Sequence, residues 1–501
     1  MPGTTRAGRR AATDEARRTF LKMAAAGALA GGAPLPAIAQ EKAAASGPGK
    51  AGIAETIARY AVDLRYEDLP ADVVRTAKRT ILDTIGCAIG GHAAKPSQIA
   101  IALAGEITAR RPATVLCSGL RTSPELAVFA NGVMIRYLDF NDGYVSYTRS
   151  PGHPSDMLAA LLAAAELSGS SGREFVTAFV LAFEVMCKVL DVFEVQALGV
   201  DHTTTTGLGA TVGIARLMGL TERQIVDAIG ITVGGNTAIH QGRVGTLSNW
   251  KAYAAADACR KAMFAVELVQ AGLTGPNQVF EGRDGFFNVI SRKPFTLPAL
   301  GAPYAIMRTF TKRFALGLFS QTVAQAAVEA RAQVASVDDI AAVDIGVSRA
   351  AIRIMADSPD KWRPQTHETA DHSIPYSAAV ALMYGKVEAE HYDDPYLHDA
   401  RLLDLVARVK VAPSDEADRR EKEFNLCDLA VVLKSGERRT VRVEYHRGHF
   451  RNPMTDDEME EKFRSLARKR LSAERIDALL QLLWAIETLP QASAVIAATV
   501  A

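Results

Sequence analysis

The chain has 501 residues, of which 48% are hydrophobic and 23% are charged, and its formal net charge is +1. This composition is typical of globular proteins and excludes disordered, collagen-like and fibrous classes. At about 150 residues per domain, the length predicts two or three domains with a large buried core. A charge so close to neutral also argues against a nucleic-acid-binding surface.

The cysteines are too scattered to form a disulfide framework or a cysteine-bound metal centre. They are Cys87, Cys117, Cys187, Cys259 and Cys427, and no two of them are arranged as C-x-x-C. A cysteine-bound zinc ion or iron–sulfur cluster therefore has no support in the sequence.

Residues 1–39 have the features of a twin-arginine export signal. Arg17 and Arg18 precede a weakly apolar run rich in alanine and glycine, and Ala37-Ile38-Ala39 follows as a candidate cleavage site. We expect residues 1–39 to be a signal peptide, residues 40–50 to be a linker, and the mature protein to be periplasmic. A basic tail or a start codon placed too early is the alternative, in which case the protein would be cytoplasmic.

Removal of the signal changes the charge of the protein but leaves no membrane anchor. Residues 1–39 hold six Lys/Arg and two Asp/Glu, so their loss changes the formal charge from +1 to −3. Any attraction of an anion must then be local. No later apolar run reaches the roughly 18 residues that a membrane span needs.

The pattern from residue 51 to 294 is helical and rich in alanine. Val73, Ala77 and Ile81 recur at a spacing near 3.6 in a segment that begins at Pro70 and ends at Gly91. A capping box at 221–224 and a long periodic stretch at 249–271 predict further helices. We expect about eight or more helices, bundled into one all-helical domain.

The character of the chain changes in residues 295–450. Residues 342–348 alternate between apolar and polar, and 429–433 and 440–445 flank a Lys434–Glu437 turn, which predicts a strand and a hairpin. Helical patterns at 320–334 and 373–384 make this an α+β domain. Two more helices, one capped by Thr455 and one at 472–489, are expected to return residues 451–501 to the helical domain.

Some motifs resemble known signatures but fail on context. The glycine-rich run 207–213 has the wrong spacing for dinucleotide binding and no preceding strand, so we interpret it as close helix packing. His367 and His372 are five residues apart, so they do not share a helix face as zinc ligands do. Ser248-x-x-Lys251 lacks the companion motifs of penicillin-recognising enzymes.

Three polar clusters remain as candidates for chemistry. Asp139 and Asp142 are expected to close a helix, with a polar loop after them and His153 at the next helix start. The alternative is that the two acids cap a turn and that His153 is a surface residue.

The other two clusters lie at predicted helix starts. His202 precedes four threonines, whose hydroxyls and free N–H groups favour an anion, or which simply over-provide an N-cap. Arg243 and Lys251 flank a polar turn, where two cations could hold a carboxylate, or be solvated.

Taken in order along the chain, these stretches resemble the MmgE/PrpD family. The resemblance rests on Ala130–Asp142, Gly152-His153-Pro154-Ser155, Leu247–Lys251, Thr274-Gly275-Pro276, Phe280-Glu281-Gly282 and Glu368–Tyr376. It covers nearly the whole chain from about residue 51. It implies a mostly α fold, in which a large all-helical domain carries a smaller α+β lid, and a homodimer without a metal or a cofactor.

The resemblance also assigns roles to individual residues. It implies an acid–histidine pair at Asp139 and His153, a second site histidine at His202, and lysines that face substrate carboxylates at Lys251 and Lys312. Two positions depart from the family pattern: Gly317 stands where a histidine is usual, and Gly143 where a threonine is common.

These residues predict a lyase that removes water from a 2-methylcitrate-like di- or tricarboxylate. We expect His153, oriented by Asp139, and His202 to transfer protons. Lys251, Lys312 and Arg243 would hold carboxylates, and Asp142 and His372 complete the expected substrate-binding set. Decarboxylation or isomerisation of a related acid is the alternative within enzymes. A periplasmic carboxylate-binding protein without catalytic activity is the alternative from another class.

Overall fold

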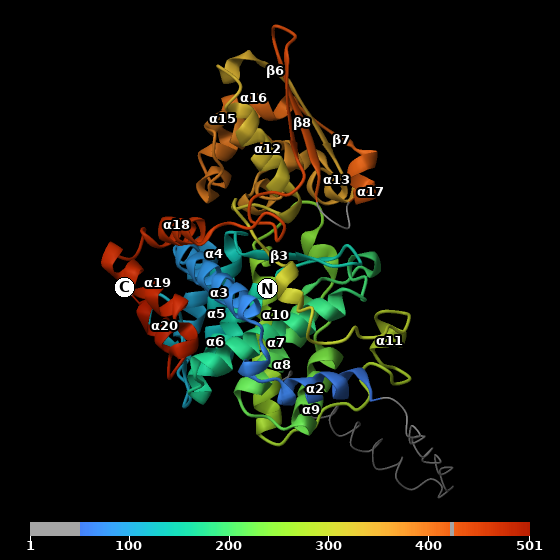
Figure 1. Cartoon of the computed structure of the whole chain (residues 1–501), viewed down its shortest axis with the longest axis vertical. Helices are drawn as coiled ribbons and strands as arrows, with labels where there is room; N and C mark the ends of the chain where they lie inside the picture. Colours follow the sequence, from blue (N-terminus) through green and yellow to red (C-terminus); the bar gives the residue numbers. More distant parts are fainter. Residues whose placement is uncertain (1–50, 421–424, 501) are drawn as a thin grey trace, which may run out of the picture. The chain divides into compact units, whose positions relative to one another are not determined.

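The computed structural model describes residues 51–420 and 425–500, so the expected signal peptide and linker lie outside the described residues. The described chain is mostly helical and contains a smaller α+β part, as the sequence predicts (Figure 1). Its apolar residues form two main hydrophobic cores. The first draws on residues 53–307 and 454–498, and the second on residues 310–443.

Long helices build the first core. They are α2 (Ile53–Asp63), α3 (Ala71–Gly91), α4 (Lys95–Gly105), α5 (Pro124–Tyr137), α6 (Leu158–Ser168), α7 (Gly172–Leu190), α8 (Thr203–Leu217), α9 (Glu222–Gly235) and α10 (Trp250–Gln270), followed by the short α11 (Phe286–Val289). The predicted helices at 70–91 and 249–271 correspond to α3 and α10. The predicted capping box at Thr221 starts α9, where its hydroxyl accepts a hydrogen bond from the Gln224 N–H.

Small residues let these helices approach closely. A Cβ on Gly132 of α5 would lie only 2.8 Å from the Cβ of Ala256 on α10. On α8, a Cβ on Gly213 would lie 2.5 Å from Leu161. The run 207–213 is therefore a packing surface, as the sequence predicts. Close packing of α5 on α10 brings the end of α5 beside the start of α10, where the candidate site lies.

The helical part is not free of strands, which corrects one expectation. Two antiparallel pairs interrupt it: β1 (Ala113–Thr114) with β2 (Arg121–Thr122), and β3 (Asp142–Val145) with β4 (Pro151–Gly152). β3 also pairs with β5 (Phe310–Thr311). The expected polar loop after Asp142 is thus a hairpin. Because Asp142–Tyr144 is buried, its backbone groups must be paired, and the two neighbouring strands pair them.

The C-terminal helices return to the first core. α18 (Asp456–Ala467) and α19 (Ala473–Trp484) lie beside α3, and α20 (Ala494–Ala498) follows (Figure 1). Gly86 of α3 makes room for this packing, because a Cβ there would meet the Phe463 ring at 3.0 Å. Thr455 and Glu458 form the predicted capping box of α18.

A four-stranded sheet organises the second core. Its strand order is β7 (Val409–Pro413), β6 (Ile340–Val347), β8 (Cys427–Leu433) and β9 (Arg438–Val443). β6 runs parallel to β7 and antiparallel to β8, and β8–β9 is the predicted hairpin. The helices of this part are α12 (Gln321–Arg331), α13 (Arg349–Met355), α14 (His367–Ala370), α15 (Ile374–Tyr384), α16 (Ala400–Ala407) and α17 (Asp415–Arg420). Figure 1 shows α12, α15 and α16 on one side of the sheet.

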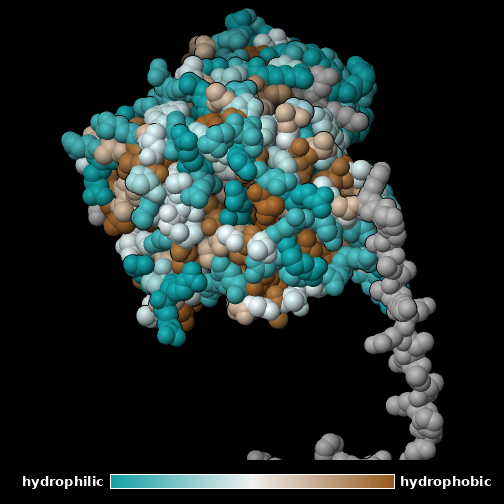
Figure 2. Space-filling model, turned by 60° about the horizontal axis from the view of Figure 1, so that its bottom comes forward, coloured by the Kyte–Doolittle hydropathy of each residue, from teal (hydrophilic) through white to brown (hydrophobic). Residues whose placement is uncertain are grey.

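The surface shown in Figure 2 is mostly hydrophilic, because most apolar residues are buried in the two cores. On the face that Figure 2 presents, hydrophilic residues predominate and the hydrophobic patches between them are separate from one another. Within residues 51–420 and 425–500, no helix combines the length and the hydropathy that crossing a bilayer requires.

Candidate active site

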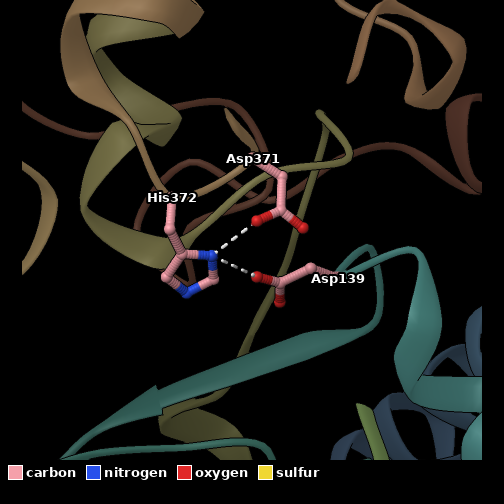
Figure 3. Close-up of side chains that lie close together, drawn as sticks. All are labelled: Asp139, Asp371 and His372. Atoms are coloured by element: carbon pink, nitrogen blue, oxygen red, sulfur yellow. Dashed lines mark hydrogen bonds and ion pairs between the residues drawn. The ribbon is translucent and has the colours of Figure 1, made fainter. Parts of the chain in front are cut away.

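The candidate site lies where the two cores meet. Asp139 follows α5 in the left-handed backbone region, with a φ of 46°, and Lys251 stands in the first turn of α10. The second core contributes Lys312, just after β5, and the pair Asp371 and His372 between α14 and α15. Figure 3 shows the two carboxylates and the imidazole of this group turned toward one another.

Asp139 is the centre of a buried group of cations. Its carboxylate forms ion pairs with Arg136, one turn earlier in the chain, and with Lys312. The Nζ atom of Lys251 lies 3.3 Å from its Oδ2 atom. Burial by itself raises the pKa of a carboxyl, but Arg136, Lys312 and Lys251 together hold the pKa of Asp139 well below its usual range. Asp139 is therefore ionised and binds the two cores together.

Asp371, which belongs to the second core, also forms an ion pair with a buried lysine. Its two oxygens lie 2.7 and 2.6 Å from the Nζ atom of Lys251, and its Oδ1 atom lies 2.7 Å from Nδ1 of His372. Burial opposes ionisation of Asp371, yet Lys251 and His372 lower its pKa. In this structure the ammonium group of Lys251 is thus shared between two aspartates.

His372 completes the group and lies against a glycine. Its Nδ1 atom also lies 3.4 Å from the Oδ2 atom of Asp139 (Figure 3). A Cβ on Gly317 would lie 3.3 Å from the Cε1 and Nε2 atoms of this ring and 2.6 Å from Met355. Burial, followed by the charge of Lys251, lowers the pKa of His372 to about 4, so the imidazole is neutral at pH 7. Because Gly317 has no side chain, the imidazole ring of His372 has room beside it.

Asp139, Asp371 and His372 offer three ligand atoms within 4.8 Å of one another, which is the spacing of a metal site. The charge does not fit a metal ion, however. Arg136, Lys251 and Lys312 already neutralise the two carboxylates, and a divalent cation would have to displace lysine nitrogens from both of them. We therefore interpret the group as an ion-pair network.

His153 is held differently from what the sequence suggests. It is buried, and its Nδ1 atom lies 2.8 Å from the main-chain oxygen of Asp142, whereas Asp139 contacts the cations and His372. The expected orientation of His153 by the carboxylate of Asp139 is therefore wrong, because the hairpin turns a backbone carbonyl toward the ring. Burial, followed by the charges of Arg136 and Lys312, holds the pKa of His153 well below its usual range.

Asp142 contacts the segment that carries this histidine. Its carboxyl accepts hydrogen bonds from the N–H and the hydroxyl of Ser155, two residues after His153. These bonds fix the backbone that follows the histidine. Burial raises the pKa of Asp142 to about 8, so the group keeps its proton at pH 7. These contacts hold the segment that carries His153, and the expected contact of Asp142 with substrate stays a prediction.

His202 lies beside His153, and Arg243 stands close to His202. The two imidazole rings meet edge to face, with centroids 5.5 Å apart. Burial lowers the pKa of His202 to about 3. Arg243 donates from Nε to Asp201 at 2.8 Å, and Asp201 also accepts from the N–H of Thr203 at the start of α8. The threonines after His202 therefore do start a helix, and the carboxylate of Asp201 already accepts from the first N–H of that helix.

A lysine of the C-terminal helix α18 supports the site from behind. The Nζ atom of Lys462 donates to the main-chain oxygens of Phe140 and Lys312, at 2.7 and 2.8 Å, and pairs with Asp83 at 2.6 Å. It thereby ties the segment that carries Asp139 to the segment that carries Lys312. The sequence analysis missed Lys462, Arg136 and Asp371 as contributors. Only the spacing of Arg136 to Asp139 carried a signal, since residues three apart share a helix face.

The architecture defines a class of protein: two cores, one helical and one α+β, with a buried network of cations, carboxylates and histidines between them. Comparison with protein families agrees. The model of the MmgE/PrpD N-terminal domain matches residues 55–297, and that of the MmgE/PrpD C-terminal domain matches residues 314–486. The chain belongs to the MmgE/PrpD family.

Several curated relatives are similar over most of their length. Human cis-aconitate decarboxylase is 26% identical over 458 residues, which cover 88% of this chain and 93% of the relative. The 2-methylcitrate dehydratase of Cupriavidus necator is 28% identical over 452 residues, covering 83% and 90%. That of Escherichia coli strain K12 is 29% identical over 422 residues, covering 77% and 84%.

Proposed function

We propose that this protein is a carbon–oxygen lyase that removes water from a 2-methylcitrate-like polycarboxylate. One observation carries the proposal: Lys251, Lys312 and His372 gather around the carboxylate of Asp139, in a chain whose relatives include 2-methylcitrate dehydratases. Lys312 also acts on the buried His153, whose ring meets that of the buried His202. Such a dehydration needs cations for the carboxylates, a base for the α-proton and an acid for the departing hydroxyl.

The imidazoles are in the protonation state that a base needs. Burial keeps the pKa values of His202 and His372 at about 3 and about 4, so both rings are neutral at pH 7 and can accept a proton. His153 is neutral for the same reason. The carbonyl of Asp142 fixes its ring by facing Nδ1, so we assign His153 as the group that moves the proton and His202 as its neighbour in the relay.

The lysines fit the roles of carboxylate clamp and acid. Burial lowers the pKa of Lys312 to about 8, close enough to neutral pH that this ammonium can donate its proton. Because Lys251 and Lys312 are paired with Asp139 and Asp371, a substrate carboxylate must share or replace these partners. Developing enolate charge would then be stabilised by cations that are already in place.

The test is a substrate panel followed by optical absorbance of the unsaturated product. Purified residues 40–501 are incubated with 2-methylcitrate, citrate and cis-aconitate. We expect turnover of at least one of these acids by dehydration or by the reverse hydration. If the folded protein turns over none of these three acids, the proposal is contradicted.

A second candidate function is decarboxylation or isomerisation of a related unsaturated acid. The similarity to human cis-aconitate decarboxylase favours it, and the same lysines would stabilise the carbanion that carbon dioxide leaves behind. Release of carbon dioxide separates it from dehydration. A carboxylate-binding protein without catalytic activity is the remaining alternative, and calorimetry would reveal it as tight binding without turnover.

We also propose that the mature protein is a periplasmic homodimer. Export rests on the twin arginines of residues 1–39. Support for the dimer comes from apolar side chains on two adjoining helices, Ile99 and Leu103 on α4 and Trp250 on α10, which are 44–51% exposed. The hydroxyl of Tyr253 joins the two helices by donating to the Pro96 carbonyl at 2.7 Å. Light scattering behind size-exclusion chromatography tests the dimer.

A further inference from the structure

A cavity of about 470 Å³ opens between the start of α8, the 3-10 turn His240–Arg243 and the first turns of α10. Its lining includes Thr203, Arg243 and Lys251, the acidic residues Asp201 and Asp257, which are paired with arginines, and the half-exposed Trp250. The volume is in the range of sites that hold small molecules. One of its walls, Lys251, also belongs to the ion-pair network of the candidate active site.

Two hydrogen-bond donors in this lining are buried without a partner. Arg243 uses Nε for Asp201 and Nη1 for the Lys251 carbonyl, but its Nη2 atom has no partner in the described part of the chain. The hydroxyl of Thr203, which is fully buried, has none there either. An unsatisfied buried donor costs about 1–3 kcal/mol, so two of them lining one cavity indicate a missing acceptor.

A third unpaired atom lies on the way to the catalytic histidine. The Nε2 atom of His202, the residue before Thr203, is buried and has no hydrogen-bond partner within residues 51–420 and 425–500. Its ring contacts the ring of His153. The unpaired polar atoms therefore extend from the cavity to the proposed proton-transfer group.

The donors specify the chemistry of the missing ligand. A guanidinium N–H and a hydroxyl can both donate to the oxygens of one carboxylate, and an arginine held by an aspartate is already oriented for this. Asp201 is held ionised, because Arg243 lowers its pKa against the effect of burial, so the pair is preformed. No neutral apolar ligand would satisfy these atoms.

We propose that this cavity is a subsite for one carboxylate of the substrate, with Arg243 and Thr203 as its specificity-determining residues. The carboxylate at Arg243 is distinct from those held by Lys251 and Lys312, and it directs the reacting carbon toward His202 and His153. The proposal rests on the proposed function in that the ligand is a polycarboxylate.

Thr203→Val gives the sharpest test, because it removes an unpaired hydroxyl and keeps the shape of the side chain. A hydroxyl without a partner stabilises nothing, so we expect the melting temperature of the free protein to stay the same or to rise. Propane-1,2,3-tricarboxylate is a suitable calorimetric probe, because it lacks the hydroxyl that dehydration removes. Its Kd should rise about 3- to 10-fold, the effect of one hydrogen bond.

The arginine is tested as a pair. Arg243→Gln alone would leave Asp201 buried without its cation, so the variant is Arg243→Gln with Asp201→Asn, which removes both charges and keeps an acceptor for the Thr203 N–H. We expect the Kd for the tricarboxylate to rise about 10- to 100-fold. Arg223→Gln is the matched control: Arg223 pairs with Asp227 on α9, and neither residue is part of the cavity wall, so its Kd should stay unchanged.

The outcomes separate this proposal from the proposed function. Equal Kd values in all variants, or no binding of the tricarboxylate to the wild type, overturn the subsite. A loss of affinity confined to the Thr203 and Arg243 variants supports it, even if no polycarboxylate is turned over. Turnover that these variants leave untouched would keep the lyase and remove the subsite.

Discussion

The ammonium of Lys251, on the helical core, lies 2.6 Å from the carboxylate of Asp371, on the α+β core. Both groups are buried, and the charge of Lys251 lowers the pKa of Asp371 against the effect of burial. The residue expected to bind substrate is thus also a link between the two cores. Substrate binding and the contact between the cores should therefore be coupled.

That link predicts different effects of single and paired substitutions. Lys251→Met leaves Asp371 buried without its main cation, and we expect it to lower the free energy of unfolding by about 3–5 kcal/mol. Lys251→Met with Asp371→Asn should recover most of that loss but not the affinity for a polycarboxylate. Denaturant titration and calorimetry measure the two quantities. Wild-type affinity in the double variant would show that Lys251 does not touch the substrate.

His153 can be separated from its structural contact by a conservative change. In His153→Asn the amide nitrogen can take the place of Nδ1 opposite the Asp142 carbonyl, while the Nε2 position is lost. We expect kcat to fall about 10²–10⁴-fold, as for the loss of a general acid–base group, with little change in melting temperature.

His446→Asn is the matched control for this experiment. His446 is also buried, and its Nδ1 atom faces the Arg447 carbonyl at 3.1 Å. The control should keep its turnover. A His153→Asn variant that is as active as this control would move the proton-transfer role to His202 or His372.

The buried acid Asp142 predicts a dependence of stability on pH. Its pKa is about 8 in the folded protein and about 3.8 when unfolded, so between these values the folded state holds one more proton. This contribution to stability is present below pH 4 and is lost as the pH rises through 8. Asp142→Asn does not titrate, so its stability relative to the wild type should increase by about 1.4 kcal/mol per pH unit from pH 5 to 8 and level off above that. Denaturant titrations of the two proteins that stay parallel across this range would show that Asp142 is ionised.

Gly317 predicts a steric effect on His372. In Gly317→Ala the new Cβ would meet the Met355 methyl at 2.6 Å and the His372 ring at 3.3 Å, so the methionine side chain and the imidazole ring must both shift. We expect a loss of about 1–3 kcal/mol in stability, typical of overpacking, and a clear fall in kcat. Gly346→Ala is the control, since its Cβ would meet no atom closer than 3.7 Å. Unchanged kcat in Gly317→Ala would remove His372 from the reaction.

The export proposal is tested in the bacterial cell. Arg17→Lys with Arg18→Lys should hold the protein in the cytoplasm, and the mature wild type should begin near Gln40. Arg9→Lys with Arg10→Lys changes the same number of arginines in the same segment and should leave export intact. Cytoplasmic wild-type protein that retains residues 1–39 would refute the proposal.

Local features of the fold could be predicted from the sequence, and distant pairings could not. The periodicity of α3 and the capping box of α9 involve residues within a few turns, so the pattern alone reveals them. The contacts of Asp139 with Lys251 and of Lys251 with Asp371 join residues more than a hundred positions apart. Nothing in a single sequence ranks Asp371 above its neighbours, and His153 was assigned the wrong partner because a backbone carbonyl leaves no signal in the sequence.

The central claim is the loss of water from a polycarboxylate by a buried imidazole, and mass spectrometry tests it most directly. Residues 40–501 and the His153→Asn variant are incubated with 2-methylcitrate and citrate in deuterated water. We predict an unsaturated acid that has lost one water from the wild type alone, and deuterium at the α-carbon of substrate recovered from it. Loss of carbon dioxide instead of water, or equal dehydration by both proteins, would contradict the account.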